Sequence, residues 1–170
     1  MTTTMKTHIP SDLEFEDLEF IERDDLIDLG VRVLGDKFPE LDDGEMVIDY
    51  RWKRKGGKSG GNLVMGKCVK LSGLAKSYAK EAHFTIWLAA DHCRSHALDQ
   101  HQLEALMFHE LSHIEREEPE DEDKPVIYRT KGHDAELFFG DLQQYGAWNT
   151  TLQRLEAVVR QLPLPIAIEA

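Results

Sequence analysis

The chain has 170 residues, of which 41% are hydrophobic, and 20 Lys and Arg against 32 Asp and Glu give it a formal charge of −12. This length suits one domain with one core, and there is no run of about 18 apolar residues that could cross a membrane. The two cysteines, Cys68 and Cys93, exclude a disulfide framework, and neither belongs to a Cys-x-x-Cys pair, which excludes a four-cysteine zinc ribbon.

The N-terminal segment bears on the location of the protein. Residues 1–11 are expected to form a disordered lead-in. The residues that follow turn acidic where a secretory signal needs an apolar stretch of about 7 to 15 residues. Together with the low cysteine content, this start predicts a cytoplasmic protein.

The first half of the chain predicts a helix followed by three strands. Apolar residues recur at helical spacing over residues 19–37; they are Leu26, Leu29, Val33 and Leu34. Three β-like segments follow, over residues 45–55, 62–73 and 83–92. The link over residues 72–82 is either a helical turn or irregular. These elements predict an α+β fold with a small, partly antiparallel sheet of three strands.

The second half is predicted to be mainly helical. Asp99 and Gln102 form a capping box in front of a helix over residues 100–115. Seven of the nine residues in 115–123 are acidic, which predicts a solvated loop. An extended piece at 126–130 and two further helices, over 132–146 and 148–161, complete a single domain expected to span residues 12–162. Residues 163–170 form a tail.

Basic residues are concentrated in one part of this acidic chain. Residues 51–80 contain nine Lys or Arg and no Asp or Glu. The five that lie in and around the expected basic hairpin are Arg51, Lys53, Arg54, Lys55 and Lys58. A solvated outer face of this hairpin is the favoured interpretation, and a surface for nucleic acid or an acidic partner is the alternative.

The motif His109-Glu110-Leu111-Ser112-His113 is the strongest indication of chemistry. One helical turn separates its two histidines, so both imidazoles project from the same side and can bind one Zn²⁺. Glu110 is rotated around the helix towards the open position of the metal. There its carboxylate can take a proton from bound water.

A third protein ligand is needed for a catalytic zinc site. His133 is favoured because it opens a helix after the acidic loop, so that it can fold back over the first helix. Glu136 is the alternative, as a carboxylate from that second helix, and Asp134 is expected to support a ligand. The residues three and six positions after His113 are Arg116 and Pro119, which excludes the metzincin arrangement.

The segments ALMFHELSHI and GHDAELFFGDLQQYGAW, preceded by a Lys- and Gly-rich hairpin and a strand, resemble the putative phage metallopeptidase family over about residues 45–150. They are more distantly similar to compact zinc proteases of the SprT and WLM kind. The resemblance implies a minimal zincin-like fold whose third strand borders the cleft. It also implies His109, His113 and His133 as ligands and Glu110 as the catalytic acid and base, and the host cytoplasm as the location of a phage-encoded protein.

The leading hypothesis is a metallopeptidase with one Zn²⁺ per chain, which hydrolyses peptide bonds with Glu110 as general base. Its peptide or protein substrate is expected to add as a strand along residues 85–90. Tyr128 and Tyr145 are candidates to stabilise the oxyanion, although packing roles are favoured for both. The alternative is a non-catalytic module, in which zinc staples the C-terminal helices and the basic hairpin contacts nucleic acid or a host protein.

Overall fold

The computed structural model describes residues 5–121, 123–134, 143–147 and 150–162. The chain forms two compact units, Met1–Lys131 and Gly132–Ala170. Their boundary lies inside the range 12–162 that the sequence analysis treats as one domain, and the expected tail at 163–170 lies outside the described residues. Within the described ranges, no helix combines the length and the apolar character that a membrane span requires.

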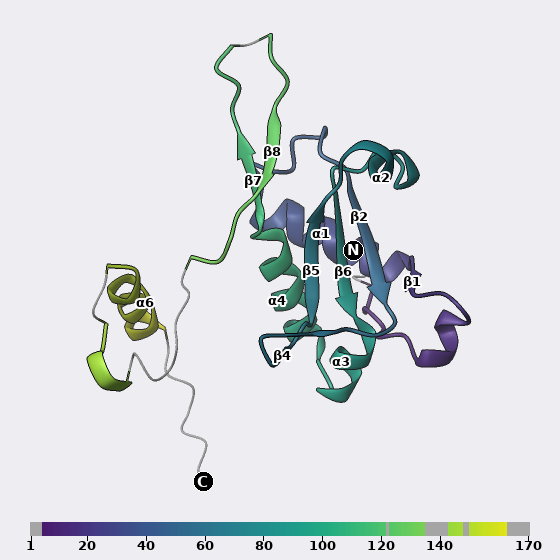
Figure 1. Ribbon diagram of the computed structural model, residues 1–170, viewed down its shortest axis with the longest axis horizontal. Coiled ribbons are helices and arrows are strands. Elements are labelled where there is room, and N and C mark those ends of the chain that lie inside the picture. The colour runs from purple at the N-terminus through teal and green to yellow at the C-terminus, as the bar shows by residue number, and fades with distance from the viewer. Residues whose placement is uncertain (1–4, 122, 135–142, 148–149, 163–170) are drawn as a thin grey trace. The chain divides into compact units, whose positions relative to one another are not determined.

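The first unit is an α+β domain, as expected, built on a four-stranded sheet (Figure 1). The strands, in their order across the sheet, are β1 (Phe20–Ile21), β2 (Ile48–Lys53), β6 (Phe84–Ala89) and β5 (Gly66–Lys70). β2 and β6 run parallel, whereas the two outer strands are antiparallel to their neighbours. The sheet therefore contains one strand more than the three expected, because β1 adds to the edge of β2.

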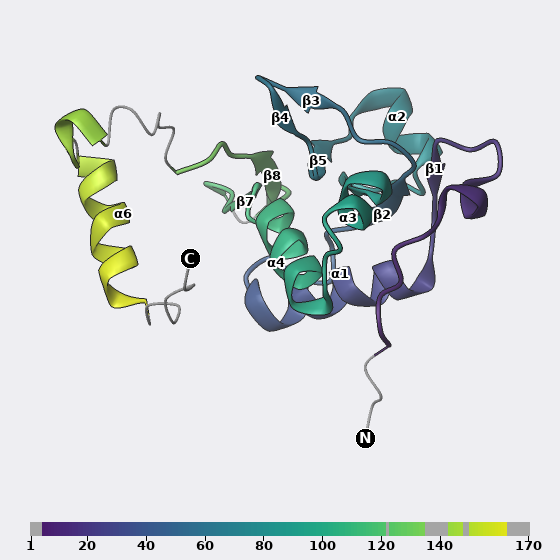
Figure 2. The same ribbon diagram turned by 90° about the horizontal axis from the view of Figure 1, so that it is seen from below.

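Two helices, α1 (Asp24–Lys37) and α4 (Gln100–Leu111), cover one face of this sheet (Figure 2). Their apolar side chains pack with alternate residues of the strands, including Tyr50 and Trp52 of β2 as the alternation predicts. Shorter elements connect the rest. They are the 3-10 helix Asp12–Phe15, α2 (Gly73–Tyr78), α3 (Ala90–Ser95), the hairpin of β3 (Lys58–Ser59) with β4 (Asn62–Leu63), and the hairpin of β7 (Ile114–Glu117) with β8 (Ile127–Thr130).

The described part of the second unit contains α6 (Thr150–Gln161). This helix agrees with the last helix expected from the sequence, whose first two residues lie outside the described ranges. The helix expected over residues 132–146 falls largely on residues 135–142, which also lie outside them. Leu152 is the buried residue of α6, and Val158 and Val159 are exposed.

Element boundaries differ from the expected ones where pairing in a sheet ends a helix or delays its start. α1 begins at Asp24 and not at residue 19, because residues 20–21 pair with β2. α4 ends at Leu111 and not at residue 115, because Ile114 already pairs with β8. Strand hydrogen bonds from a distant segment thus compete with local helical bonds at both places.

The lead-in is hydrogen-bonded where the structure describes it, although the sequence suggests disorder for residues 1–11. The Gln100 side chain accepts from the Thr7 N–H (2.8 Å) and donates to the Thr7 carbonyl (2.7 Å). The His8 N–H donates to the Asp25 carboxylate (2.6 Å). Because Asp25 and Gln100 lie in the first turns of α1 and α4, this segment is held against the beginnings of both helices.

Strand β6 lies at the centre of the sheet, between β2 and β5. Its side chains are buried on both faces except for half-buried Thr85, a pattern typical of a central strand. The expectation that a substrate pairs with residues 85–90 is therefore wrong, because both edges of β6 are already paired within the sheet. The edge strand on that side of the sheet is β5.

The basic segment does not form one hairpin, because β6 separates β2 from β5 and only the short β3–β4 turn projects. Three of the five cations in and around the expected hairpin are paired with carboxylates of the N-terminal region. These pairs are Arg51 with Glu22, Lys53 with Glu19, and Arg54 with Asp12. Lys55 and Lys58 form no ion pair with another described residue. Contact with nucleic acid through this surface stays a prediction, with most of its charge already neutralised.

The β7–β8 hairpin occupies much of the segment expected as an acidic loop, and β8 agrees with the expected extended piece at 126–130. Asp43, from the loop between α1 and β2, binds both strands of the hairpin. Its Oδ2 accepts from Arg116 Nε (3.1 Å) and from the Tyr128 hydroxyl. Its Oδ1 accepts from the N–H groups of Glu45 (2.9 Å) and Met46 (3.0 Å). One carboxylate therefore connects the hairpin to the start of β2.

Protonation of the Asp43 carboxylate is expected to make the protein less stable in acid. Burial alone would raise the pKa of its carboxyl, but hydrogen bonds from Tyr128, the Glu45 and Met46 backbone and Arg116 lower that pKa from 3.8 to about 2. Because the pKa is depressed in the folded state, a stabilisation of about 2 kcal/mol is present above about pH 4 and is lost as the pH falls towards 2. Urea unfolding of the parent and Asp43→Asn should show the difference in their unfolding free energies shrinking over this range. A difference that does not depend on pH contradicts the assignment.

Candidate metal centre

Helix α4 presents the first candidate ligand on a well-defined scaffold. The capping box predicted at its start is confirmed, because the Gln102 N–H donates to Asp99 (2.8 Å) and the Asp99 N–H donates to the Gln102 side chain (3.0 Å). Three apolar side chains of the helix are fully buried in the core: Leu103, Met107 and Leu111. This packing fixes the rotation of the helix and leaves His109 exposed.

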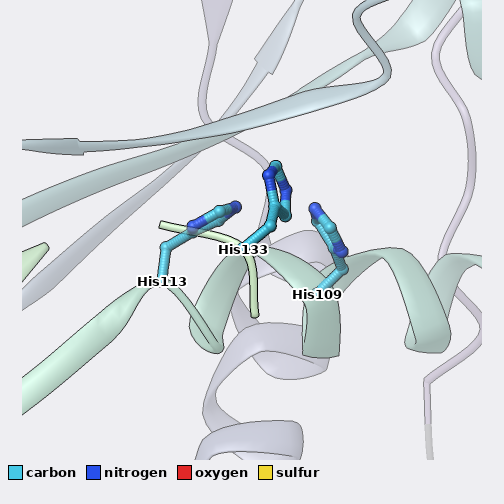
Figure 3. A group of neighbouring side chains, drawn as sticks. All are labelled: His109, His113 and His133. Atoms are coloured by element: carbon cyan, nitrogen blue, oxygen red, sulfur yellow. The ribbon is translucent and has the colours of Figure 1, made fainter. Parts of the chain in front are cut away.

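His113 follows the last residue of α4 by two positions. The helical path still reaches it, because the Ser112 and His113 N–H groups donate to the carbonyls of Phe108 and Glu110. The rings of His109 and His113 lie edge to face, with centroids 5.1 Å apart. Both rings project from the same side of α4, as the spacing predicts (Figure 3).

The ring of His113 is oriented by the chain segment after β8. Its Nδ1 lies 2.9 Å from the Lys131 carbonyl oxygen, and the Lys131 N–H donates in turn to the His113 carbonyl (2.8 Å). A carbonyl oxygen only accepts, so Nδ1 carries the hydrogen in this contact. This leaves Nε2 as the ring nitrogen whose lone pair could bind a metal ion, an arrangement common among metal-ligating histidines.

His133 follows Lys131 by two residues, and two residues of chain span at most about 7 Å. The backbone bonds between Lys131 and His113 therefore keep His133 in the neighbourhood of His113. Each of His109, His113 and His133 offers one ligand atom, and these three atoms lie within 4.8 Å of one another. Figure 3 shows the three imidazoles gathered around one space.

Glu110 is turned towards strand β5, where its carboxylate meets Gly66 and the Cys68 backbone N–H. Its side chain is only 4% exposed. Burial raises the pKa of the Glu110 carboxyl to about 7, although the nearby His113 and a hydrogen bond from the Cys68 backbone N–H act to lower it. A carboxyl whose pKa is near neutrality can both take up and release a proton at physiological pH.

A family model provides the decisive comparison. The sequence model described as putative phage metallopeptidase matches residues 18–160. The chain belongs to this family. No curated protein and no solved structure shows a significant match to the chain. The family assignment confirms the resemblance seen in the sequence, and it covers α1, the whole sheet and α4 as well as part of the second unit.

Membership of the phage metallopeptidase family implies a metal ion, and the three histidines fit one. Three imidazoles are an established donor set for a catalytic zinc ion. Nitrogen atoms bound to a tetrahedral zinc at about 2.1 Å lie about 3.4 Å apart, whereas the three ligand atoms lie within 4.8 Å of one another. Side-chain shifts of about 1 Å would close this gap, and the rings of His109 and His133 are exposed.

Strand β5 is an edge strand of the sheet, and it lies beside Glu110. On its other side β5 is paired with β6, and this pairing extends to the flanking residues. The Met65 carbonyl oxygen accepts from the Ala89 N–H, and the Leu71 N–H donates to the His83 carbonyl oxygen. Because backbone pairing alternates along an antiparallel strand, the residues that direct their N–H and C=O groups to the unpaired edge are Gly66, Cys68 and Lys70. The Cys68 N–H is the one that meets Glu110.

Gly66 is expected to be intolerant of any side chain. A Cβ atom at this position would lie 2.8 Å from Glu110 Oε1 and 3.1 Å from the Trp87 carbonyl oxygen. We expect Gly66→Ala to lower the free energy of unfolding by about 1–3 kcal/mol and to displace the Glu110 carboxylate. Urea unfolding measures the first effect, with Gly57→Ala as the control, because a Cβ atom at Gly57 meets nothing within 4 Å. Equal losses in the two variants would contradict the close approach.

The remaining candidates from the sequence are engaged in another contact, are exposed, or fall outside the described residues. The Tyr128 hydroxyl donates to Asp43, which supports the packing role favoured for this residue. Tyr145 is 74% exposed in the second unit. Asp134 is exposed, and Glu136 lies outside the described residues, so the choice between His133 and Glu136 stays a prediction.

Sequence reasoning missed the contacts of two residues, Gly66 beside Glu110 and Asp43 with the β7–β8 hairpin. Gly66 interrupts a β-like segment, and an isolated glycine in a strand is itself a signal of close backbone approach. Asp43 carries no comparable signal, because the sequence Asp43-Gly44 indicates only a turn. Its role depends on contacts with residues more than 70 positions later in the chain.

Proposed function

We propose that this protein is a zinc-dependent peptidase in which His109, His113 and His133 hold the metal ion and Glu110 transfers the proton. One observation carries the proposal. The ligand atoms of the three histidines lie within 4.8 Å of one another, while the glutamate next to His109 is buried against the edge of a sheet. The family assignment supports peptide-bond hydrolysis as the reaction.

Each residue has a distinct task in the proposed reaction. When bound, the zinc ion acidifies its water ligand and polarises the carbonyl of the substrate. Glu110 accepts a proton from the attacking water, whose oxygen forms a bond to the carbonyl carbon. The same carboxyl then donates this proton to the amide nitrogen as the C–N bond breaks, so the products are a new amine and a new carboxylic acid, which loses its proton to solvent.

Strand β5 suits a substrate in extended conformation. Gly66 and Lys70 direct backbone N–H and C=O groups to the unpaired edge, and a peptide can pair with them as an added strand. The Glu110 carboxylate meets this strand at Gly66 and Cys68. A bond of the peptide held at this edge therefore lies beside the proposed general base, and the substrate class is an unfolded or locally extended protein segment.

Metal content and hydrolysis, measured on the same preparation, test the proposal. Elemental analysis of the untagged protein is expected to give about one zinc per chain. A quenched fluorescent, unfolded protein should be cleaved by this preparation, cleavage should stop after the metal is removed with a chelator, and added Zn²⁺ should restore it. A folded protein that takes up no zinc would overturn the proposal.

A further inference from the structure

We propose that Asp43 is a positioning residue for the metal ligands, because it holds the β7–β8 hairpin that joins His113 to His133. This inference rests on the proposed zinc site. It concerns a residue far from the histidines in the sequence, which is connected to them through the hairpin.

The hairpin connects the two ligands directly. β7 begins at Ile114, immediately after His113, and β8 ends at Thr130, three residues before His133. Ile114 and Thr130 are paired at the base of the hairpin, and Lys131 continues the pairing to the His113 backbone and ring. A shift of β8 along β7 therefore changes the position of His133 relative to His113.

The hydrogen bonds of Asp43 to both strands oppose such a shift. Its Oδ2 accepts from Arg116 on β7 and from Tyr128 on β8, and these two residues lie directly opposite each other in the strand register. Its Oδ1 accepts from two backbone N–H groups of its own loop, those of Glu45 and Met46. The carboxylate thus holds one cross-strand pair to the loop that leads into β2.

Apolar burial is limited among the described residues of the two hairpin strands. Only Ile114 in β7 and Tyr128 in β8 are buried, whereas the other residues of both strands are exposed or half-buried. The Tyr128 ring contacts the His83 ring edge to face at 5.0 Å. With so little apolar burial, the hydrogen bonds to a largely buried carboxylate, whose side chain is 16% exposed, are a main restraint on the hairpin.

Zinc affinity measured against a chromophoric chelator tests this inference. Asp43→Ala removes the anchor, and the double variant Arg116→Gln/Tyr128→Phe removes its two partners while leaving the loop bonds of Asp43 in place. We expect either change to weaken zinc binding about 10- to 100-fold. Combining all three substitutions should weaken it no further, because both changes remove the same connection.

A matched control separates positioning from general destabilisation. Arg51→Gln breaks an ion pair of β2, at a side chain 27% exposed against 22% for Arg116, and it should leave zinc affinity within about twofold of the parent. The visible spectrum of the Co²⁺-loaded protein should change in the anchor variants and not in this control, since it reports the arrangement of the ligands.

The outcomes distinguish the inference from the function on which it rests. Zinc binding by the parent together with unchanged affinity in the anchor variants overturns the role of Asp43 and leaves the zinc site intact. A parent that binds no zinc overturns both. If Asp43→Ala does not fold, Tyr128→Phe alone decides, because it keeps the ring and loses one hydrogen bond; we expect it to weaken zinc binding about two- to tenfold, and parent-like affinity would contradict the inference.

Discussion

Glu110→Gln is expected to abolish peptide hydrolysis while zinc stays bound. The amide has nearly the shape of the carboxylate, so it fits the space beside Gly66, and its oxygen still accepts from the Cys68 N–H. It cannot take up the proton that the reaction releases. Loss of a general base lowers kcat by about 10²- to 10⁴-fold. Hydrolysis of a quenched fluorescent peptide and the zinc content of the same sample provide the two measurements.

A control on the same helix makes this result specific. Glu104 is paired with Arg32 at 2.9 Å and is partly exposed, so Glu104→Gln removes a carboxylate from α4 without touching β5. This control should keep both zinc and activity. Parent-like cleavage by Glu110→Gln would show that another group moves the proton, although the zinc site itself would stand.

His133→Ala is expected to remove most of the affinity for zinc, whereas Glu136→Ala leaves it unchanged. The free energy of zinc binding to a site with several protein ligands is about 10–16 kcal/mol. The loss of one ligand should therefore weaken binding by about 100- to 1000-fold. Isothermal titration with Zn²⁺ measures the affinity, and elemental analysis measures the zinc retained after gel filtration.

His101→Ala is the matched control for this prediction. His101 is exposed near the start of α4 and belongs to no group of candidate ligands among the described residues. The His101→Ala variant should therefore bind zinc with the affinity of the parent protein. Retention of zinc by His133→Ala together with its loss from Glu136→Ala would assign the third ligand to the carboxylate instead.

Several parts of the fold follow from local patterns. The capping box of Asp99 and Gln102 is confirmed, because it depends on residues three positions apart at one helix end. The alternation over residues 46–52 correctly predicts that Tyr50 and Trp52 face the core. The last helix is confirmed over Thr150–Gln161. In each case neighbouring residues contain the physical information.

Other parts follow from pairing between distant segments and were not predictable in this way. The insertion of β6 between β2 and β5 moves the unpaired edge from residues 85–90 to residues 66–70. Residues 20–21 pair with β2 where the start of a helix was expected. The free energy of such pairing depends on which strands are available at a distance, and no short window of sequence contains it.

The family and the spacing of His109, Glu110 and His113 follow from the sequence without a structure. That spacing is a property of the helical backbone and needs no other part of the molecule. Two other features are visible only in the folded chain: the strand that borders Glu110 and the loop that binds the hairpin before His133. The first depends on the close approach of the Glu110 carboxylate to β5, which the missing side chain of Gly66 permits. The second depends on the Asp43 carboxylate, whose partners Arg116 and Tyr128 are far from it in the sequence.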